Sequence, residues 1–286
     1  MGLLRINDLS DLVAPTIVVA FDAWVDAGSA ATNAIDALLD TDSRPVATFE
    51  ADVLFDYRAR RPTLDIVDGR PASLDWPEIA IRRTVLRDTD VLALTGPEPD
   101  FRWRELADDL VAFSRQLDVA QWITLGAIPA AVPHTRPVPI LGTESGPGLL
   151  RGDVQPGPAG LLRVPAACVS VLDISVADAG IPTVGYFAQI PHYISGEYAP
   201  AAIALVEALG RHLDTEIDVS ELRSEASLLR SRLDAATAAD DKTRTYVERL
   251  EAMVDESRLP EGDELISEIE RFLRDRGSEP GHGQVH

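Results

Sequence analysis

Two of the five histidines, His134 and His192, are placed where α/β proteins commonly carry out acid–base chemistry. Each follows an apolar run that predicts a strand, and loops at strand ends are the usual sites of such proteins. Imidazole titrates near neutral pH, so a histidine in such a loop is a candidate proton donor or acceptor. A lone loop histidine is more often a hydrogen-bonding group that holds loops together. We favour that interpretation for each histidine and leave the catalytic one open.

Polar neighbours accompany both histidines. Arg136 lies two residues after His134, and Tyr193 directly follows His192. Folding could bring these loops together with carboxylates from elsewhere in the chain. The motif H-E-x-x-H is absent from the sequence, and the spacing H-x-x-x-H occurs only at His282 and His286 in the tail, so no preformed zinc site is predicted.

A turn with two aspartates, Asp22 and Asp26, joins a predicted strand at 16–21 to an alanine-rich helix at 29–39. Backbone N–H groups at the start of a helix can bind an anion. The two carboxylates repel an anion, however, so we expect them to cap the helix or hold a neighbouring loop.

A third polar cluster, residues 52–62, combines three arginines with two aspartates and a tyrosine. One interpretation is a clamp for an anion or a carboxylate, because guanidinium groups bind carboxylates through paired hydrogen bonds. The favoured interpretation is an interlocked salt network at the surface or at a subunit interface, where arginine is enriched. The candidate residues of this cluster are Asp56, Tyr57, Arg58 and Arg61.

The chain lacks the motifs that hold common cofactors and nucleophiles. It contains no G-x-x-x-x-G-K-[ST] or G-x-G-x-x-G loop for phosphates and no G-x-S-x-G turn. Its single cysteine, Cys168, lies in an apolar run, which predicts a buried side chain and excludes a disulfide within the chain. We therefore expect neither a cofactor nor a metal.

Strand and helix patterns alternate over residues 1–213, which predicts an α/β domain whose sheet is covered by helices on both faces. Runs rich in β-branched residues are typical of buried strands, and 3.6-residue periodicity is typical of helices. Strands are predicted at 16–21, 45–49, 64–67, 79–86, 91–96, 120–126, 138–141 and 182–190, and helices at 29–39, 103–117, 165–179 and 200–213.

Residues 214–276 have a different composition, with 18 acidic and 10 basic residues. Their narrow apolar stripes predict an acidic appendage of two or three helices that dock on the α/β body. The Gly/Pro-containing tail at 277–286 is expected to be disordered.

The whole chain has 286 residues and a formal net charge of −21. Such a charge repels phosphate backbones and anionic lipid surfaces, so neither nucleic acid nor a membrane is an expected partner. No stretch approaches the ~20 apolar residues of a membrane span, and the first residues do not form a signal peptide. These features favour a cytoplasmic protein.

Five segments, taken in order along the chain, point to a known family. They are Ala20–Ala31, Asp56–Pro62, Pro133–Val138, Gly180–Pro182 and Ile190–Tyr193. With this ordered set the chain resembles the PAC2 family, named for a proteasome assembly chaperone, and in particular its actinobacterial branch.

The resemblance implies a three-layer α/β fold similar to that of nucleoside phosphorylases, usually in homo-oligomers that include trimers. It implies no established reaction. Relatives assemble proteasome α-subunits, and some dock through a C-terminal hydrophobic-Tyr-any tripeptide, which Gln284-Val285-His286 does not match.

Two functional hypotheses follow. The first is a non-enzymatic interaction protein or assembly chaperone, homo-oligomeric, with proteasome subunits or other proteins as clients. The alternative is a phosphorylase- or hydrolase-like enzyme, or a small-molecule binder, with a cleft at the strand ends. The lining residues of that cleft would be Asp22, Asp26, Arg58, His134, His192 and Tyr193.

Overall fold

The structure of the protein is a computed structural model, which describes residues 2–257 except 11, 23, 41–42, 153 and 159. The chain divides into two compact units, Met1–Ala235 and Ala236–His286. The sequence suggested a boundary after residue 213. The division falls later, inside a helix, because the first turns of that helix pack on the α/β body.

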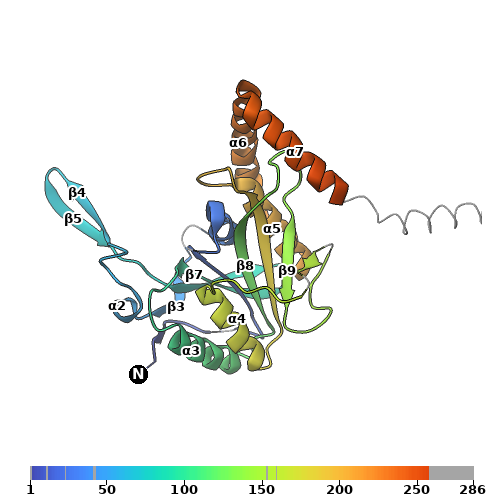
Figure 1. Cartoon of the computed structure of the whole chain (residues 1–286). Coiled ribbons are helices and arrows are strands. Elements are labelled where there is room, and N and C mark those ends of the chain that lie inside the picture. Colours follow the sequence, from blue (N-terminus) through green and yellow to red (C-terminus); the bar gives the residue numbers. More distant parts are fainter. Residues whose placement is uncertain are drawn as a thin grey trace, which may run out of the picture. The chain divides into compact units, whose positions relative to one another are not determined.

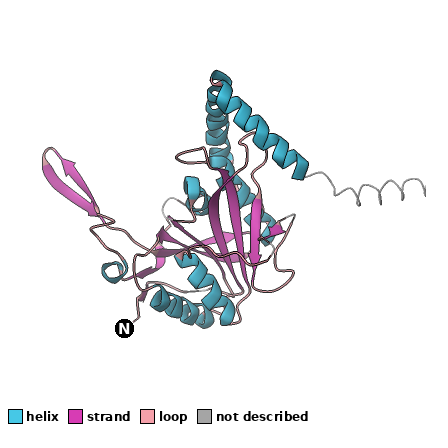
Figure 2. Ribbon diagram, in the orientation of Figure 1, coloured by secondary structure: helices cyan, strands magenta, loops and turns pink. Residues whose placement is uncertain are grey.

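The first unit is built around one mixed sheet of nine strands (Figures 1 and 2). Their order across the sheet is β1-β3-β6-β7-β2-β8-β11-β9-β10. The strands are β1 (Leu4–Ile6), β2 (Thr16–Asp22), β3 (Pro45–Phe49), β6 (Ala80–Leu86), β7 (Thr89–Pro97), β8 (Gln121–Ala130), β9 (Ile140–Glu144), β10 (Gln155–Pro156) and β11 (Thr183–Pro191).

Four parallel strands, β7, β2, β8 and β11, form the centre of the sheet. In β2, Ile17 lies opposite Leu92 of β7 and Trp122 of β8. The first six residues of β2 are buried, as expected for a parallel strand that is covered on both faces. The strands β6, β3 and β1 continue the sheet in antiparallel order on one side, and β9 is antiparallel to β11 on the other.

Helices cover both faces of the sheet, so the predicted α/β architecture is confirmed. Helices α1 (Ala30–Asp36) and α5 (Ala199–Leu213) pack on the face formed by residues such as Val18 and Ile123. Helices α3 (Trp103–Gln116) and α4 (Cys168–Asp178) pack on the opposite face. The predicted burial of Cys168 is confirmed, since its side chain lies in this second core.

A β-hairpin stands apart from the sheet. Strands β4 (Thr63–Val67) and β5 (Arg70–Asp75) pair only with each other, and Figure 1 shows the hairpin projecting away from the body. Asp68 and Gly69 form its turn with positive φ angles of 50° and 74°, and Asp-Gly is a favoured pair for such two-residue turns. The short helix α2 (Ala51–Leu54) precedes the hairpin.

Two C-terminal helices follow the body, α6 (Ser220–Ala239) and α7 (Asp241–Ser257). Within the first unit, the stripe of α6 formed by Leu222, Ala226, Leu229 and Leu233 packs against the core that contains α5. The third expected helical stripe, at 265–273, and the tail at 277–286 lie outside the described residues. No helix in the described part of the chain is long and apolar enough to cross a membrane.

Candidate functional site

The parallel pairing of β8 and β11 brings the two histidine loops together. Residues 183–191 of β11 pair in register with residues 122–130 of β8, so both strands end at the same edge. The backbone N–H of His192 donates to the carbonyl oxygen of Ala130 at 3.1 Å, and His192 Nδ1 lies 3.0 Å from the same oxygen. The exposed His192 is therefore held against the end of β8.

Tyr193 connects the two loops directly. Its hydroxyl accepts a hydrogen bond from the backbone N–H of His134 at 2.8 Å and lies 2.7 Å from His134 Nδ1. Its ring also lies edge-on to both imidazoles, with centroid distances of 5.9 Å to His134 and 5.8 Å to His192. The predicted convergence of His134, His192 and Tyr193 is therefore present in the structure.

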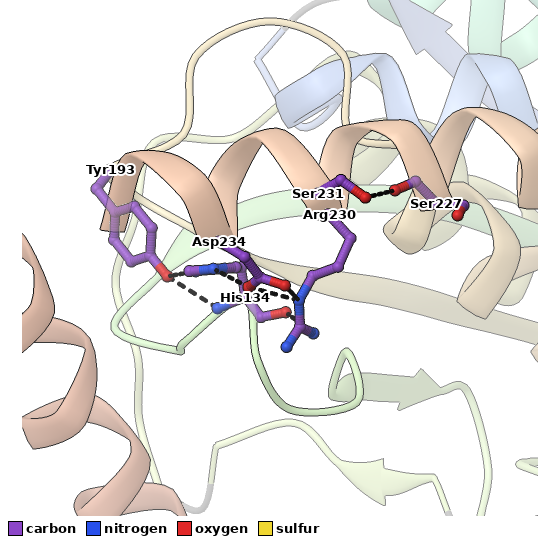
Figure 3. A network of polar contacts seen from close by, with 6 residues as sticks. All are labelled: His134, Tyr193, Ser227, Arg230, Ser231 and Asp234. Atoms are coloured by element: carbon purple, nitrogen blue, oxygen red, sulfur yellow. Dashed lines mark hydrogen bonds and ion pairs between the residues drawn. The ribbon is translucent and has the colours of Figure 1, made fainter. Parts of the chain in front are cut away.

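Helix α6 completes this group with two charged residues that the sequence did not single out. Asp234 Oδ1 lies 3.3 Å from His134 Nε2, and Arg230 Nη1 donates to the carbonyl oxygen of His134 at 3.0 Å. Arg230 Nε also bonds both carboxylate oxygens of Asp234, at 2.9 and 3.0 Å. Figure 3 shows these four side chains meeting at one point of α6. We call His134, Tyr193, Arg230 and Asp234 the His134 cluster.

The ring of His134 is held from both sides. Its Nδ1 shares a hydrogen bond with the Tyr193 hydroxyl, a group that can donate or accept, and its Nε2 faces the carboxylate of Asp234. The side chain of His134 is only 1% exposed. The cluster therefore fastens α6 to the loops after β8 and β11.

A second tyrosine lies near the cluster. Tyr198 is buried, and burial raises the pKa of its phenol to about 12, with Tyr193 raising it further and Arg230 opposing this. Its backbone N–H donates to the carbonyl oxygen of Gly28 at 2.9 Å. This bond connects the β11–α5 loop to the turn after β2.

Asp26 takes the structural role that the sequence favoured. Its carboxylate accepts hydrogen bonds from the backbone N–H of Ala31 at 2.6 Å and from Thr32 Oγ1 at 2.6 Å, at the start of α1. Burial raises the pKa of this carboxyl, although those hydrogen bonds oppose the shift. Asp22 is exposed at the end of β2, where its carbonyl oxygen accepts from Glu98 N at 3.2 Å.

The remaining candidates lie at the base of the hairpin. The backbone N–H of Asp56 donates to Asp100 Oδ2 at 2.7 Å, and Asp56 Oδ1 accepts from the backbone N–H of Arg58 at 2.9 Å. Tyr57 donates to Asp52 Oδ1 at 2.7 Å, and burial followed by this bond raises its pKa to about 12.

The arginines at this base form no salt network within the described residues. No ion pair joins Arg58, Arg60 or Arg61 to a described carboxylate, and the buried Nε of Arg60 has no hydrogen-bond partner there. Among the described residues of one chain the interlocked surface network is therefore not present. An anion clamp and an interface between chains remain.

The structure thus divides the candidates into two groups on one edge of the sheet. The hairpin base lies beside the end of β7, because Asp56 bonds Asp100 just beyond that strand. The His134 cluster lies at the ends of β8 and β11. Three strand spacings separate β7 from β11, which is about 14 Å. Asp22 lies between the groups at the end of β2, and Arg136 lies in the His134 loop, where its N–H faces Pro133 O at 3.5 Å.

Two further half-buried polar residues were missed by sequence reasoning. Asp173 of α4 accepts from Trp122 Nε1 at 2.9 Å and from Thr124 Oγ1 at 2.5 Å, and burial raises its pKa to about 7. His212 of α5 lies between Tyr186 (2.7 Å) and Gln121 (2.8 Å), and burial lowers its pKa to about 4. The sequence feature that could have pointed to Asp173 is a charged residue within a mostly apolar helix.

A cavity of about 1080 Å³ lies away from both groups, where α5 meets α6. Its walls include Arg87, Arg211 and Arg223 with Glu207 and Asp214, and these charges are partly paired, for example Arg87 with Asp214 at 3.3 Å. Among the described residues, no three His, Cys, Asp or Glu side chains gather as a metal-binding group.

Comparison with known proteins decides the family. The family model for PAC2 matches residues 20–237, which is most of the chain. The chain belongs to the PAC2 family. This PAC2 protein is similar in structure to a Mycobacterium tuberculosis proteasome-assembly chaperone homologue, with 32% sequence identity and a TM-score of 0.73. That match covers 81% of this chain and 99% of the other.

Two further solved structures place this PAC2 protein among its relatives. A PAC2 family protein from Streptomyces avermitilis has 32% identity and a TM-score of 0.69, and the match covers 82% of this chain and 99% of the other. The archaeal proteasome activator PbaB from Pyrococcus furiosus shares the fold, with 15% identity, a TM-score of 0.63 and coverage of 82% and 99%. A search of curated proteins found no match.

Proposed function

We propose that this PAC2 protein acts by binding other proteins, as a homo-oligomeric assembly chaperone in the cytoplasm, with proteasome subunits as the partner class. The family membership and the description of the mycobacterial relative as a proteasome-assembly chaperone homologue support this proposal. The net charge of −21 also favours a protein partner over nucleic acid.

One structural observation carries the proposal. The histidine that best suits acid–base chemistry, His134, is almost fully buried, and both its ring nitrogens face side chains of this chain. A general base must reach the proton of a bound substrate within hydrogen-bond distance. The His134 cluster therefore serves to hold loops and α6, which suits a binding protein better than an enzyme.

The test is binding to a defined partner. Purified full-length protein is mixed with separately expressed α-type subunits of an actinobacterial proteasome and analysed by size-exclusion chromatography and biolayer interferometry. We expect a complex with α-type subunits and none with β-type subunits, which are the matched control.

If no complex forms with each protein at about 100 µM, the dissociation constant is weaker than that of ordinary transient interfaces. That result would remove the proteasome from the proposal. Native mass spectrometry of protein purified from its own host tests the alternative. A small extra mass on each subunit, in place of a protein partner, would favour the enzyme or small-molecule binder.

A further inference from the structure

The β4–β5 hairpin has an apolar face that nothing in the described chain covers. Leu64 and Ile66 lie two residues apart on β4, and Leu74 is the direct cross-strand partner of Leu64, so the three share one face. Their exposed fractions lie between 46% and 62%, and every residue from 63 to 76 is exposed. Isolated two-stranded hairpins are marginal in water, so this one is expected to be stabilised by a surface that it packs against.

The base of the hairpin is firmly attached to the body. The ring of Trp76 lies edge-on to that of Tyr57 with a centroid distance of 4.8 Å, and Tyr57 bonds Asp52 next to α2. Asp56 is held by Asp100. The hairpin, with its base, therefore projects as an arm from a fixed point, as Figure 1 shows. We call residues 57–76 the arm.

The charge of the arm is opposite to that of the chain as a whole. The arm holds four arginines and three aspartates, whereas the full chain has a net charge of −21. Arg58, Arg60 and Arg61 pair with no carboxylate in the described residues. Opposite charges across an interface favour encounter and fix orientation, so the surface of a second copy of this acidic chain suits the arm.

The chain also carries a second apolar surface that its described residues leave exposed. Residues 160–166 are all exposed, form no regular secondary structure and make no backbone hydrogen bond to another described residue. They lead directly into α4, a mostly apolar helix whose residue Ile174 is also exposed. We call Leu161, Leu162, Val164 and Ile174 the α4 patch; their exposed fractions are 60–81%.

We propose that the arm of one protomer packs on the α4 patch of a second copy, with an edge of the hairpin pairing with the backbone of 160–166. The hairpin has two open edges, and such an edge can pair with a segment whose backbone groups make no hydrogen bond to another described residue, as at 160–166, where only Pro165 lacks an N–H. The apolar faces of the two partners bury each other, and the arm arginines meet acidic groups outside 160–166, because Arg163 is the only charged residue of that segment. The inference rests on the proposed homo-oligomer and identifies its interface.

The test uses the full-length protein and matched single substitutions. Ile66→Asp changes the apolar face of the arm, Leu162→Asp changes the α4 patch, and Val67→Asp places the same charge on the opposite face of β4. Mass is measured by light scattering over a concentration series. We expect an oligomer for the wild type and Val67→Asp, and at least a tenfold weaker association for the other two variants.

Mixing the two disrupted variants gives the sharper result. The Leu162→Asp protein keeps an intact arm, and the Ile66→Asp protein keeps an intact patch, so their mixture should form a heterodimer that neither forms alone. Should an aspartate variant fail to fold, Ile66→Cys mixed with Leu162→Cys should form an intermolecular disulfide. Val13→Cys, exposed elsewhere on the body, mixed with Leu162→Cys should not.

Each contrary outcome has a separate meaning. A wild-type protein that stays monomeric overturns the homo-oligomer and this interface together. An oligomer that Ile66→Asp leaves unchanged overturns the role of the arm but not the proposed function. Dissociation by Ile66→Asp with no effect of Leu162→Asp, and no disulfide in the cysteine mixture, overturns the α4 patch as the surface that receives the arm.

Discussion

Asp234 Oδ1 of helix α6 lies 3.3 Å from Nε2 of the buried His134, while Tyr193 occupies the other side of the same ring. These three residues come from the loop after β8, the loop after β11 and a C-terminal helix. The contact therefore connects the α/β body to the part of the chain that the sequence marks as an appendage, and its contribution to stability can be measured.

Replacing Tyr193 with phenylalanine removes the hydroxyl that accepts from His134 N and faces its Nδ1. The buried N–H and ring nitrogen of His134 then lose this partner, which costs about 1–3 kcal/mol of unfolding free energy. Urea unfolding followed by circular dichroism measures the change. Ser231→Ala is the control, because Ser231 is exposed on α6 and its hydroxyl donates to the Ser227 carbonyl of its own helix; it should change stability by less than about 0.5 kcal/mol. Equal effects of the two substitutions would show that the cluster does not fasten α6.

Asp173 and His212 should give stability profiles of opposite slope. Burial raises the pKa of Asp173 from 3.8 to about 7 in the folded protein, so the folded state holds a proton that the unfolded state releases between these values. Stability due to Asp173 therefore falls as pH rises from about 4 to 7, by about 1.4 kcal/mol per pH unit at most. Burial lowers the pKa of His212 from 6.5 to about 4, so stability due to His212 falls as pH drops through the same range.

The two slopes should oppose each other in the wild type between about pH 4 and 6.5, and single variants should separate them. In Asp173→Asn the profile should fall toward acid, as His212 dictates. In His212→Gln it should fall toward neutral pH, as Asp173 dictates. The measurement is the free energy of unfolding at half-unit pH steps, with the exposed Asp178→Asn as control. Parallel profiles for the two variants would contradict the assigned pKa directions.

Cys168 should be unreactive in the folded protein. Its thiol is buried, and burial together with the nearby Glu98 raises its pKa, so little thiolate is present at neutral pH. A disulfide reagent such as Ellman's reagent should therefore label it only as the chain unfolds, in step with the loss of circular dichroism. An added cysteine at the exposed position 13 provides the control and should react at once. Rapid labelling of the native wild type would contradict the burial.

Gly28 should tolerate no side chain. Its φ is +65°, and a Cβ atom there would lie 2.9 Å from Cβ of Tyr198. Gly28→Ala should lower the free energy of unfolding by about 1–3 kcal/mol, since it combines left-handed backbone with a close contact. Gly146→Ala is the matched control, because a Cβ atom added at Gly146 would meet no atom within 4 Å and its φ is not in the left-handed region. Equal thermal unfolding midpoints for the two variants would contradict this role of the turn.

The sequence by itself determined the α/β body and the family. Runs such as 16–21 and 91–96 are apolar on both faces, which is typical of a strand that is covered on both faces. The spacing of Leu106, Leu110 and Phe113 is that of a helix with one buried face. The grouping of His134, His192 and Tyr193 was also predictable, because parallel neighbouring strands end at the same edge.

Only the tertiary structure decided which other residues join these groups. Arg230 and Asp234 are an ordinary i,i+4 pair in a charged helix, and nothing local marks them as neighbours of a histidine almost a hundred positions earlier. The strand predicted at 64–67 gave no sign that its partner would be β5 alone rather than the main sheet. Pairing between distant segments depends on how whole elements pack, and that information is spread over the chain instead of residing in a local pattern.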